Sequence, residues 1–125
     1  MHIEVEGVVV KGAGRGAGMG FPTANIALDP LINIRSGVYA VEVRFDGYRF
    51  GGVANVGTHP TVGESPVRLL EVHLFGFGGD LYGKTIHVRF ITRLRDECRF
   101  DDTDQLREAV AEDIARAKIV CGCAL

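Results

Sequence analysis

The most constraining feature of the sequence is a pair of alternating segments joined by two turn residues. Within residues 37–45, every second side chain from Tyr39 onward is large and apolar, as in a strand with one face in a core. Asp46 and Gly47 follow, and this pair favours a two-residue hairpin because both positions tolerate positive φ. Residues 48–56 then read as the partner strand. Antiparallel β-structure is therefore expected here.

Further segments with β-strand character lie on both sides of this hairpin. Residues 3–10 are rich in valine, and residues 68–77 and 85–92 are expected to form another antiparallel pair. In the last of these, side chains such as Val88 should point inward and His87 outward. Short strands separated by Gly and Pro turns predict a mainly β fold, a closed or nearly closed antiparallel barrel.

In the last quarter of the chain, apolar residues no longer recur at every second position but at every third or fourth, as on one face of a helix. Asp102 can cap a helix, and Gln105 can close a capping box three residues later. The apolar stripe that follows comprises Leu106, Ala109, Val110, Ile114 and Ala117. We expect a helix over about residues 103–118 that buries this stripe against the barrel. The barrel is expected to span about residues 3–92. A chain of 125 residues without a linker or repeat then predicts one domain.

Charge and composition exclude several classes of protein. The 14 basic and 16 acidic residues give a net charge of −2, which offers no electrostatic case for a nucleic-acid partner. No apolar run approaches the ~18 residues of a membrane-spanning helix. The N-terminus lacks the basic and apolar regions of a signal peptide, so a cytoplasmic location is predicted. Cys98, Cys121 and Cys123 have no zinc-site spacing and are expected to be thiols near solvent.

Residues 78–85, with the sequence GGDLYGKT, satisfy the pattern of a phosphate-binding loop. That loop requires a helix beginning at its Lys and Thr, so that the helical N-terminus faces the phosphates. Here Lys84 is followed by a segment that alternates as a strand, and Leu81 and Tyr82 are bulky where backbone must wrap an anion. We therefore predict a hairpin connection instead of a phosphate-binding loop.

Glycine recurs at every second position from residue 12 to residue 20. The spacing does not fit the dinucleotide-binding fingerprint, and no βαβ unit surrounds it. One interpretation is a flexible loop. The other is a segment whose backbone N–H groups approach a phosphate chain, with Lys11 and Arg15 adding positive charge.

The string GFPTAN at residues 20–25 contains two oxygen-bearing side chains, those of Thr23 and Asn25. In an extended segment they share one face, so both oxygens could bind one hard divalent cation that bridges phosphates. The alternative is a turn in which these side chains bond to the backbone. Local chemistry alone leaves the two interpretations equally open.

Several motifs, taken in order, resemble the riboflavin kinase family. The first are GVVVKG at residues 7–12, GFPTAN at 20–25 and SGVYA at 36–40. The others are GVANVGTHPT at 52–61, EVHL at 71–74, DLYGK at 80–84 and LRDECRF at 94–100. Motifs in the right order over nearly the whole chain are far more specific than any one of them.

The resemblance implies a six-stranded antiparallel Greek-key barrel with a C-terminal amphipathic α-helix. It also implies an enzyme that transfers the γ-phosphoryl group of ATP to the 5′-hydroxyl of riboflavin, giving FMN and ADP. ATP would be the co-substrate, and Mg²⁺ or another divalent cation the cofactor. Phosphoryl transfer depends mostly on positioning and charge stabilisation, so backbone amides and one metal ion are the expected tools.

The resemblance also carries residue roles onto this sequence. Thr23 and Asn25 would bind both the metal and the nucleotide. The implied ATP contacts are Gly12, Arg15, Gly16, Thr23, Asn25, Leu74, Gly76 and Tyr82. The implied flavin contacts are Arg95, Cys98 and Phe100.

Glu71 is the catalytic carboxylate that the resemblance implies, the base that accepts the proton of the ribityl hydroxyl. It lies in the apolar segment 69–74, where an uncompensated carboxylate would be costly. The alternative is a buried acid paired with a nearby arginine, and the residues by themselves favour that alternative. The resemblance favours catalysis.

Two questions stay open: whether the chain is an enzyme or a binding module, and whether it stands alone or belongs to a longer protein. Segment 75–79 carries glycines where many bacterial relatives have acidic residues, a departure that bears on the stiffness and affinity of the nucleotide loop. The second hypothesis is a non-catalytic flavin-binding or regulatory module on the same barrel. The presence of Thr23, Asn25 and Glu71 together favours the enzyme, because a pure binder has no use for a base. Many bacterial relatives carry an FMN adenylyltransferase domain ahead of the kinase. The chain is expected to be either a free-standing kinase or a piece of such a longer protein.

Overall fold

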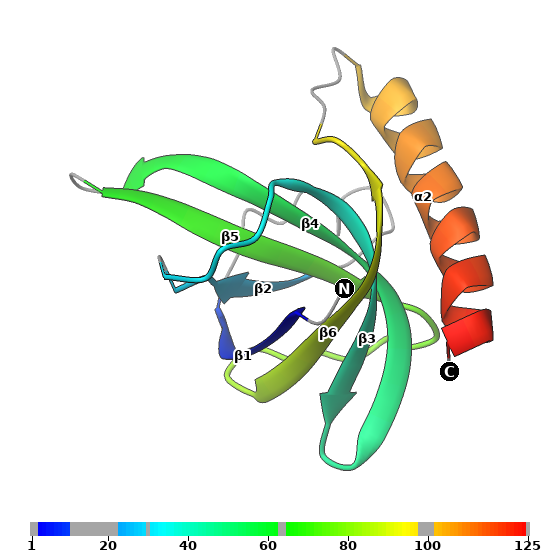
Figure 1. The fold of residues 1–125 in the computed structure, drawn as a ribbon, viewed down its shortest axis with the longest axis horizontal. Coiled ribbons are helices and arrows are strands. Elements are labelled where there is room, and N and C mark those ends of the chain that lie inside the picture. Colours follow the sequence, from blue (N-terminus) through cyan, green and yellow to red (C-terminus); the bar gives the residue numbers. More distant parts are fainter. Residues whose placement is uncertain (1–2, 11–22, 30, 63–64, 98–101, 125) are drawn as a thin grey trace.

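The computed structural model describes residues 3–10, 23–29, 31–62, 65–97 and 102–124. The described elements are β1 (Ile3–Val10), β2 (Ala24–Ala27), β3 (Gly37–Phe45), β4 (Tyr48–Val62), β5 (Ser65–Leu74), β6 (Thr85–Arg95) and α2 (Thr103–Ala124). The six strands close into one antiparallel barrel in the order β1-β2-β5-β4-β3-β6 (Figure 1). The predicted barrel with a C-terminal helix is thus confirmed.

The β3–β4 hairpin forms as its sequence indicates. Asp46 has a φ of 50° and Gly47 a φ of 80°, the two positive values that a tight two-residue turn requires. The register pairs Phe45 with Tyr48 and Gly37 with Val56. β4 then continues to Val62, beyond the end expected at residue 56, and pairs along its length with β5.

The expected pairing of residues 68–77 with 85–92 is wrong. β5 lies between β2 and β4, whereas β6 lies between β1 and β3. Residues 75–84 therefore form a crossing connection and not the predicted hairpin. Strand β6 begins at Thr85, where a phosphate-binding loop of this pattern needs a helix. Alternation identifies the buried face of a strand, but it leaves the choice of partner to the rest of the fold.

The barrel interior is filled by the inward-facing side chains of all six strands. Among the largest fully buried residues are Tyr39, Phe90, Ile26, Leu70 and Ile86. The rings of Tyr39 and Phe90 meet edge to face with their centroids 5.1 Å apart. On β6, Val88 points inward and His87 outward, as expected.

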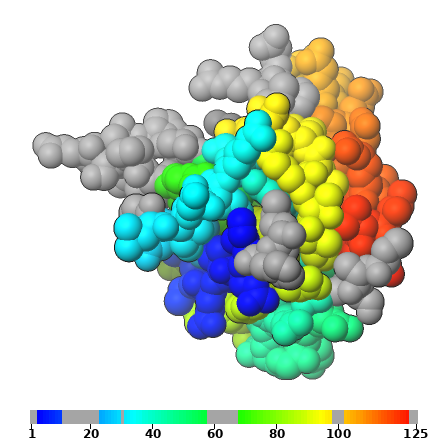
Figure 2. All heavy atoms as spheres, viewed as in Figure 1, coloured from blue at the N-terminus to red at the C-terminus, as the bar shows by residue number. Residues whose placement is uncertain are grey.

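The helix α2 covers the outside of the barrel over β3, β4 and β6 (Figure 1). In Figure 2 it lies along β6, as an orange to red ridge beside a yellow one. Its first turn is capped by Asp102, whose Oδ1 accepts a hydrogen bond of 2.7 Å from the N–H of Gln105. A second apolar cluster under the helix includes Val38, Ala40 and Ala117. β3 is therefore buried on both faces, by the barrel core and by the helix.

The helix continues to Ala124, beyond the predicted end at residue 118. The added turn brings Cys121 into the cluster under the helix with 3% exposure, so the expectation of a thiol near solvent is wrong for this residue. Its Sγ donates to the carbonyl of Val41 over 3.4 Å, and burial raises the pKa of the thiol. Cys98 and the side chain of Cys123 lie outside the described residues.

Across the described part of the chain, no helix is both long enough and apolar enough to cross a membrane.

Candidate active site

A row of polar side chains crosses three neighbouring strands on the outer face of the barrel. Glu71 on β5 is the direct register partner of Asn25 on β2 and of Asn55 on β4. The residues on either side of Glu71, Leu70 and Val72, are buried in the barrel core. Because alternate side chains of a strand point to opposite faces, the three polar side chains lie together on the outside.

The amide of Asn25 is unusual for an outward-facing residue. Its side chain is 5% exposed, and its Oδ1 is buried with no hydrogen-bond partner among the described residues. A buried amide oxygen without a partner costs free energy, so such an atom points to a ligand that completes it. Thr23, two residues earlier, adds a hydroxyl oxygen to the same site.

These two oxygens fit a hard divalent cation. Mg²⁺ binds oxygen atoms and usually keeps several waters and substrate phosphates, so it needs only one or two protein ligands. The described residues contain no group of three or more His, Cys, Asp or Glu side chains that could hold a metal. Any cation held here would therefore share its coordination with a bound phosphate or with water.

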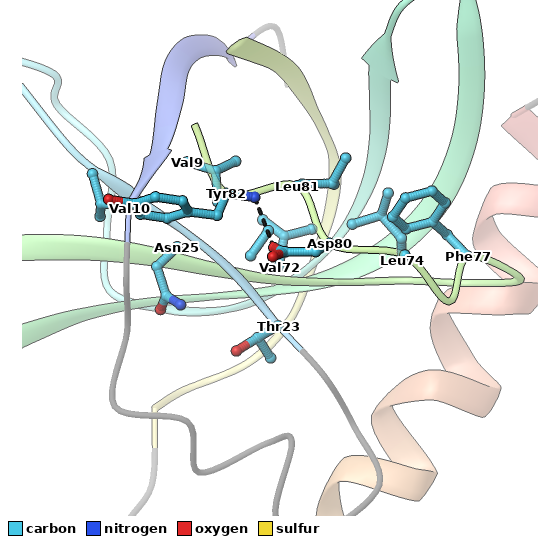
Figure 3. A pocket seen from close by; sticks show the side chains of 12 residues that line it. Val9, Val10, Thr23, Asn25, Val72, Leu74, Phe77, Asp80, Leu81 and Tyr82 are labelled. Atoms are coloured by element: carbon cyan, nitrogen blue, oxygen red, sulfur yellow. Dashed lines mark hydrogen bonds between the residues drawn. The ribbon is translucent and has the colours of Figure 1, made fainter. Parts of the chain in front are cut away.

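A cavity of about 450 Å³ opens beside Thr23 and Asn25. Its size lies in the range of pockets that hold small ligands and cofactors, which is about 300–1,000 Å³. Strand residues such as Leu74 form one part of the wall, and Phe77, Asp80 and Tyr82 of the crossing connection form another (Figure 3). The connection that the sequence predicts as a hairpin is thus a wall of the pocket.

The crossing connection is held by its own turns and by β1. The Oδ1 of Asp80 accepts a hydrogen bond of 2.9 Å from the N–H of Tyr82 (Figure 3), and the buried side chain of Leu81 anchors the segment in the core. The N–H of Gly83 donates to the carbonyl of Val9, and the N–H of Val9 donates to the carbonyl of Lys84, both over 2.9 Å. The pocket wall is therefore fixed to the barrel at β1.

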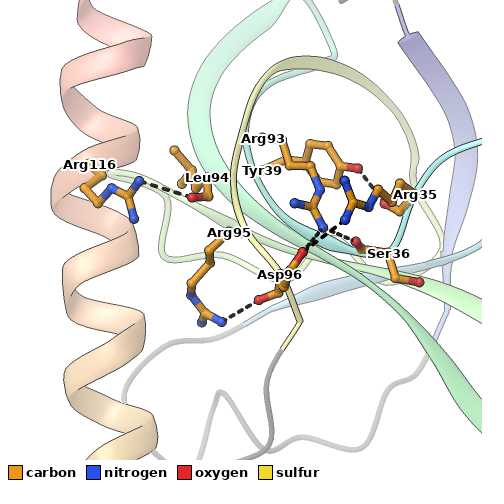
Figure 4. A network of polar contacts seen from close by, with 8 residues as sticks. All are labelled: Arg35, Ser36, Tyr39, Arg93, Leu94, Arg95, Asp96 and Arg116. Atoms are coloured by element: carbon orange, nitrogen blue, oxygen red, sulfur yellow. Dashed lines mark hydrogen bonds and ion pairs between the residues drawn. The ribbon is translucent and has the colours of Figure 1, made fainter.

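The end of β6 is fixed by an arginine and carboxylate network (Figure 4). Arg93 Nη2 donates to the carbonyl of Ser36 and to Asp96 Oδ1, both over 2.7 Å. The Arg93 guanidinium, helped by Arg35, holds the pKa of Asp96 below its usual value. This network joins the end of β6 to the start of β3.

Arg95, an expected flavin contact, is engaged with the helix. Its Nε and Nη2 donate to the two carboxylate oxygens of Asp113 over 2.8 and 2.7 Å, and its Nη1 donates to the carbonyl of Asp96 over 3.0 Å. Asp113 is 4% exposed, so this two-pronged ion pair lies under the helix. The geometry gives Arg95 a structural role, and its contact with a flavin stays a prediction.

The structure brings together part of the site expected from the sequence. Thr23, Asn25, Leu74 and Tyr82 all line the one cavity, and Glu71 lies opposite Asn25. Gly76 belongs to the crossing connection but not to the cavity lining. Outside the described residues lie Gly12, Arg15, Gly16, Cys98 and Phe100.

Three residues of this region were missed by sequence reasoning. Phe77 and Asp80 line the cavity, but the hairpin interpretation of their segment hid their position. Asn55 carried a signal, because it is a polar residue inside the otherwise apolar stretch 53–56 of a strand.

Comparison with known proteins identifies the family. A family model described as riboflavin kinase (flavokinase) matches residues 1–121. The bifunctional riboflavin kinase/FMN adenylyltransferase of Haemophilus influenzae is 43% identical over 113 residues, which are 90% of this chain and 36% of that protein. The protein of the same name from Escherichia coli strain K12 is 43% identical over 115 residues, 91% of this chain and 36% of its own length. The chain thus spans little more than a third of these relatives.

Two solved structures share the fold of this chain. A Streptococcus pneumoniae protein described as a macrolide-efflux protein is 35% identical, with a TM-score of 0.82 over 90% of this chain and 37% of that one. The riboflavin kinase of Trypanosoma brucei shares the fold, with a TM-score of 0.63 at 21% identity over 92% of this chain and 76% of that one. On the family match over residues 1–121, the chain belongs to the riboflavin kinase family.

Proposed function

We propose that this chain is a phosphotransferase that moves the γ-phosphoryl group of ATP to the 5′-hydroxyl of riboflavin, giving FMN and ADP. The observation that carries the proposal is the position of Glu71 opposite Asn25. Asn25 lines a ligand-sized cavity, and its buried oxygen has no hydrogen-bond partner within the described part of the chain. A carboxylate beside two oxygen ligands is what a metal-assisted transfer to a hydroxyl group requires.

Glu71 acts as the base in this proposal. It accepts a hydrogen bond from the ribityl hydroxyl, orients its oxygen toward the γ-phosphorus and takes its proton as the new P–O bond forms. General base catalysis of this kind typically contributes ~10²–10⁴-fold to the rate. Because the side chain is half-buried, the substrate hydroxyl can reach it from outside the barrel.

Asn25 Oδ1 and Thr23 Oγ1 are the atoms proposed to hold Mg²⁺ with the nucleotide phosphates. When bound, the cation neutralises the negative charge that accumulates on the phosphoryl oxygens. The cavity beside these atoms, with Leu74, Phe77 and Tyr82 in its wall, is proposed to receive the nucleotide. Aromatic and aliphatic side chains suit the base of a nucleotide better than its phosphates.

The remaining proposed contacts come from the resemblance and extend the site in two directions. Gly12, Arg15 and Gly16 are proposed to contact the phosphates, and Gly76 to contact the nucleotide. Arg95, Cys98 and Phe100 are proposed for the flavin. We further propose that residues 1–125 form one kinase domain. The names of the bifunctional relatives suggest an FMN adenylyltransferase as its neighbour in a longer protein.

The test is product formation from riboflavin, ATP and Mg²⁺, with the flavins separated by liquid chromatography. An FMN peak that disappears without ATP and after addition of EDTA would support the proposal. Riboflavin binding without FMN would contradict it and would favour the flavin-binding module. A matched pair of variants, Glu71→Gln in the site and Glu112→Gln on the exposed face of the helix, shows whether the activity belongs to this carboxylate.

A further inference from the structure

Asn55 continues the polar row of the candidate site on its β4 side. It is the register partner of Glu71, as Asn25 is on the β2 side, so the carboxylate side chain stands between two amide side chains. Its neighbours in the strand, Ala54 and Val56, are buried in the barrel core. Asn55 therefore faces outward, toward the same space as Glu71.

The Asn55 side chain is held by a residue distant in the sequence. Its Nδ2 donates to Glu97 Oε2 over 3.1 Å, across 42 positions of the chain. Glu97 follows β6 by two residues and comes next to Asp96, which the Arg93 network fixes. A hydrogen bond to a charged acceptor is stronger than one between neutral groups, so Glu97 orients the amide.

Gly57 leaves the space that this contact needs. A Cβ built at Gly57 would lie 2.1 Å from Glu97 Oε2 and 3.4 Å from Asn55 Nδ2, so any side chain there would displace the carboxylate. Glycine inside a strand normally weakens the strand, and it often marks a position where another group approaches the backbone closely. Here that group is the carboxylate of Glu97.

We propose that Asn55 is a positioning residue for the phosphoryl-transfer reaction: held by Glu97 across Gly57, it keeps the Glu71 carboxylate in its working orientation. This inference rests on the proposed kinase function. Without the hydrogen bond, the amide of Asn55 turns freely and Glu71 loses a fixed neighbour on one side. A catalytic group displaced by as little as about 1 Å can lose on the order of 10²-fold in rate.

The test separates turnover from substrate binding. We expect Asn55→Ala and Glu97→Ala each to lower kcat for FMN formation about tenfold, with KM for ATP changed less than about twofold. The double variant should be no slower than the slower single variant, because both substitutions remove one interaction. Glu97→Gln keeps an acceptor oxygen and should restore most of the turnover. Asn33→Ala, at an exposed asparagine away from the row, is the matched control.

Gly57→Ala is a second route to the same loss, since it displaces the Glu97 carboxylate without removing any polar side chain. Its matched control is Gly122→Ala, where an added Cβ meets nothing within 4 Å. Melting temperatures of all variants show whether each protein is folded. Lower kcat in a folded Gly57→Ala variant would support the inference, and a wild-type kcat would contradict it.

The hydrogen bond is also measurable without turnover, from the side-chain amide signals of Asn55 in ¹H–¹⁵N NMR spectra. They should move in Glu97→Ala and stay close to wild type in Glu97→Gln. Unmoved signals, additive losses in the double variant, or equal losses in kcat and ATP affinity would each overturn the inference. If the wild-type protein makes no FMN, the kinase proposal fails and this role fails with it. If the wild type makes FMN and Asn55→Ala is equally fast, only the inference about Asn55 fails.

Discussion

Asn25 on β2 and Glu71 on β5 are direct register partners, although 46 positions separate them in the chain. Their side chains leave the barrel on the same face, so an amide oxygen suited to a cation lies next to a carboxylate suited to a proton. In a phosphoryl transfer, the metal-bound phosphate and the attacking hydroxyl must meet within about 3–3.5 Å. In the proposed transfer, the β2–β5 pairing brings the amide of Asn25 and the carboxylate of Glu71 to one such meeting point.

The first prediction concerns the carboxylate. Glu71→Gln keeps the shape and much of the hydrogen bonding of the side chain but removes the base. FMN formation should fall at least about tenfold while riboflavin still binds. The measurement is steady-state turnover together with the quenching of riboflavin fluorescence. An unchanged turnover number would remove Glu71 from the mechanism.

The second prediction concerns the buried amide oxygen. Asn25→Leu removes a polar atom that has no partner among the described residues, so the free energy of unfolding should stay the same or rise. FMN formation should nevertheless fall by at least about tenfold, because a cation ligand is lost. Thermal melting and turnover on the same samples test both halves. A large loss of stability would show that the oxygen is paired within the protein.

A companion variant tests the hydroxyl of the same site. Thr23→Ala should weaken the dependence on Mg²⁺ and ATP more than riboflavin binding, since Thr23 lines the cavity beside Asn25. The measurement is a titration of activity with Mg²⁺ at fixed ATP, alongside a riboflavin binding curve. Equal losses for metal and flavin would count against the metal assignment.

The third prediction separates the two roles of Arg95. If its guanidinium only anchors the helix through Asp113, then Arg95→Met and Asp113→Asn should destabilise the protein by similar amounts, about 2 kcal/mol each for a partly exposed pair. The affinity of the folded variants for riboflavin then shows whether Arg95 also contacts the flavin. A loss confined to Arg95→Met would assign Arg95 to the flavin, and equal affinities would leave it as an anchor alone.

The fourth prediction is a pH dependence of stability that comes from Glu42. This carboxylate is 1% exposed and accepts hydrogen bonds from Arg44 over 2.6 Å and Arg89 over 3.2 Å. Burial by itself would raise the pKa of Glu42, but the two arginines outweigh it and the pKa lies below its ordinary value of 4.5. The stabilisation is therefore complete above the unfolded-state pKa and is lost as the pH falls through the lower folded-state pKa.

Glu42→Gln makes this dependence measurable. At neutral pH the variant should be less stable by about 2 kcal/mol, because the arginines lose their charged partner. The difference in unfolding free energy from wild type should shrink as the pH falls below 4.5, the ordinary value. Urea unfolding at several pH values measures it. A difference that stays constant down to strongly acidic pH would mean that Glu42 does not titrate as described.

The fifth prediction concerns Cys121. Because the thiol is buried and its pKa is raised, it should react with a thiol reagent only when the helix opens. Peptide mapping after mild alkylation should find Cys121 unmodified in the native protein and modified in urea. Rapid labelling under native conditions would contradict the close packing of the last helical turn.

Local sequence indicated most elements of this fold, though not the short strand β2, and it indicated the buried face of strands such as β3 and β6. The period of two in residues 37–45, the Asp46–Gly47 turn and the cap at Asp102 all act within a few residues, and the structure contains each of them at its predicted position. The amino-acid sequence also points to Thr23, Asn25 and Glu71, through motifs that resemble those of one family. These signals succeed because backbone preference and side-chain alternation are short-range properties.

Tertiary structure alone decided which elements meet. Residues 68–74 fit two pairings equally well in their alternation, and only closure of the barrel places β5 between β2 and β4 and not beside β6. That choice brings Asn25 and Asn55 to the two sides of Glu71 and turns residues 75–84 into a pocket wall. The burial of Cys121 likewise depends on the barrel beneath the helix. Pairing between distant strands is a property of the whole packed core, so no short window of sequence encodes it.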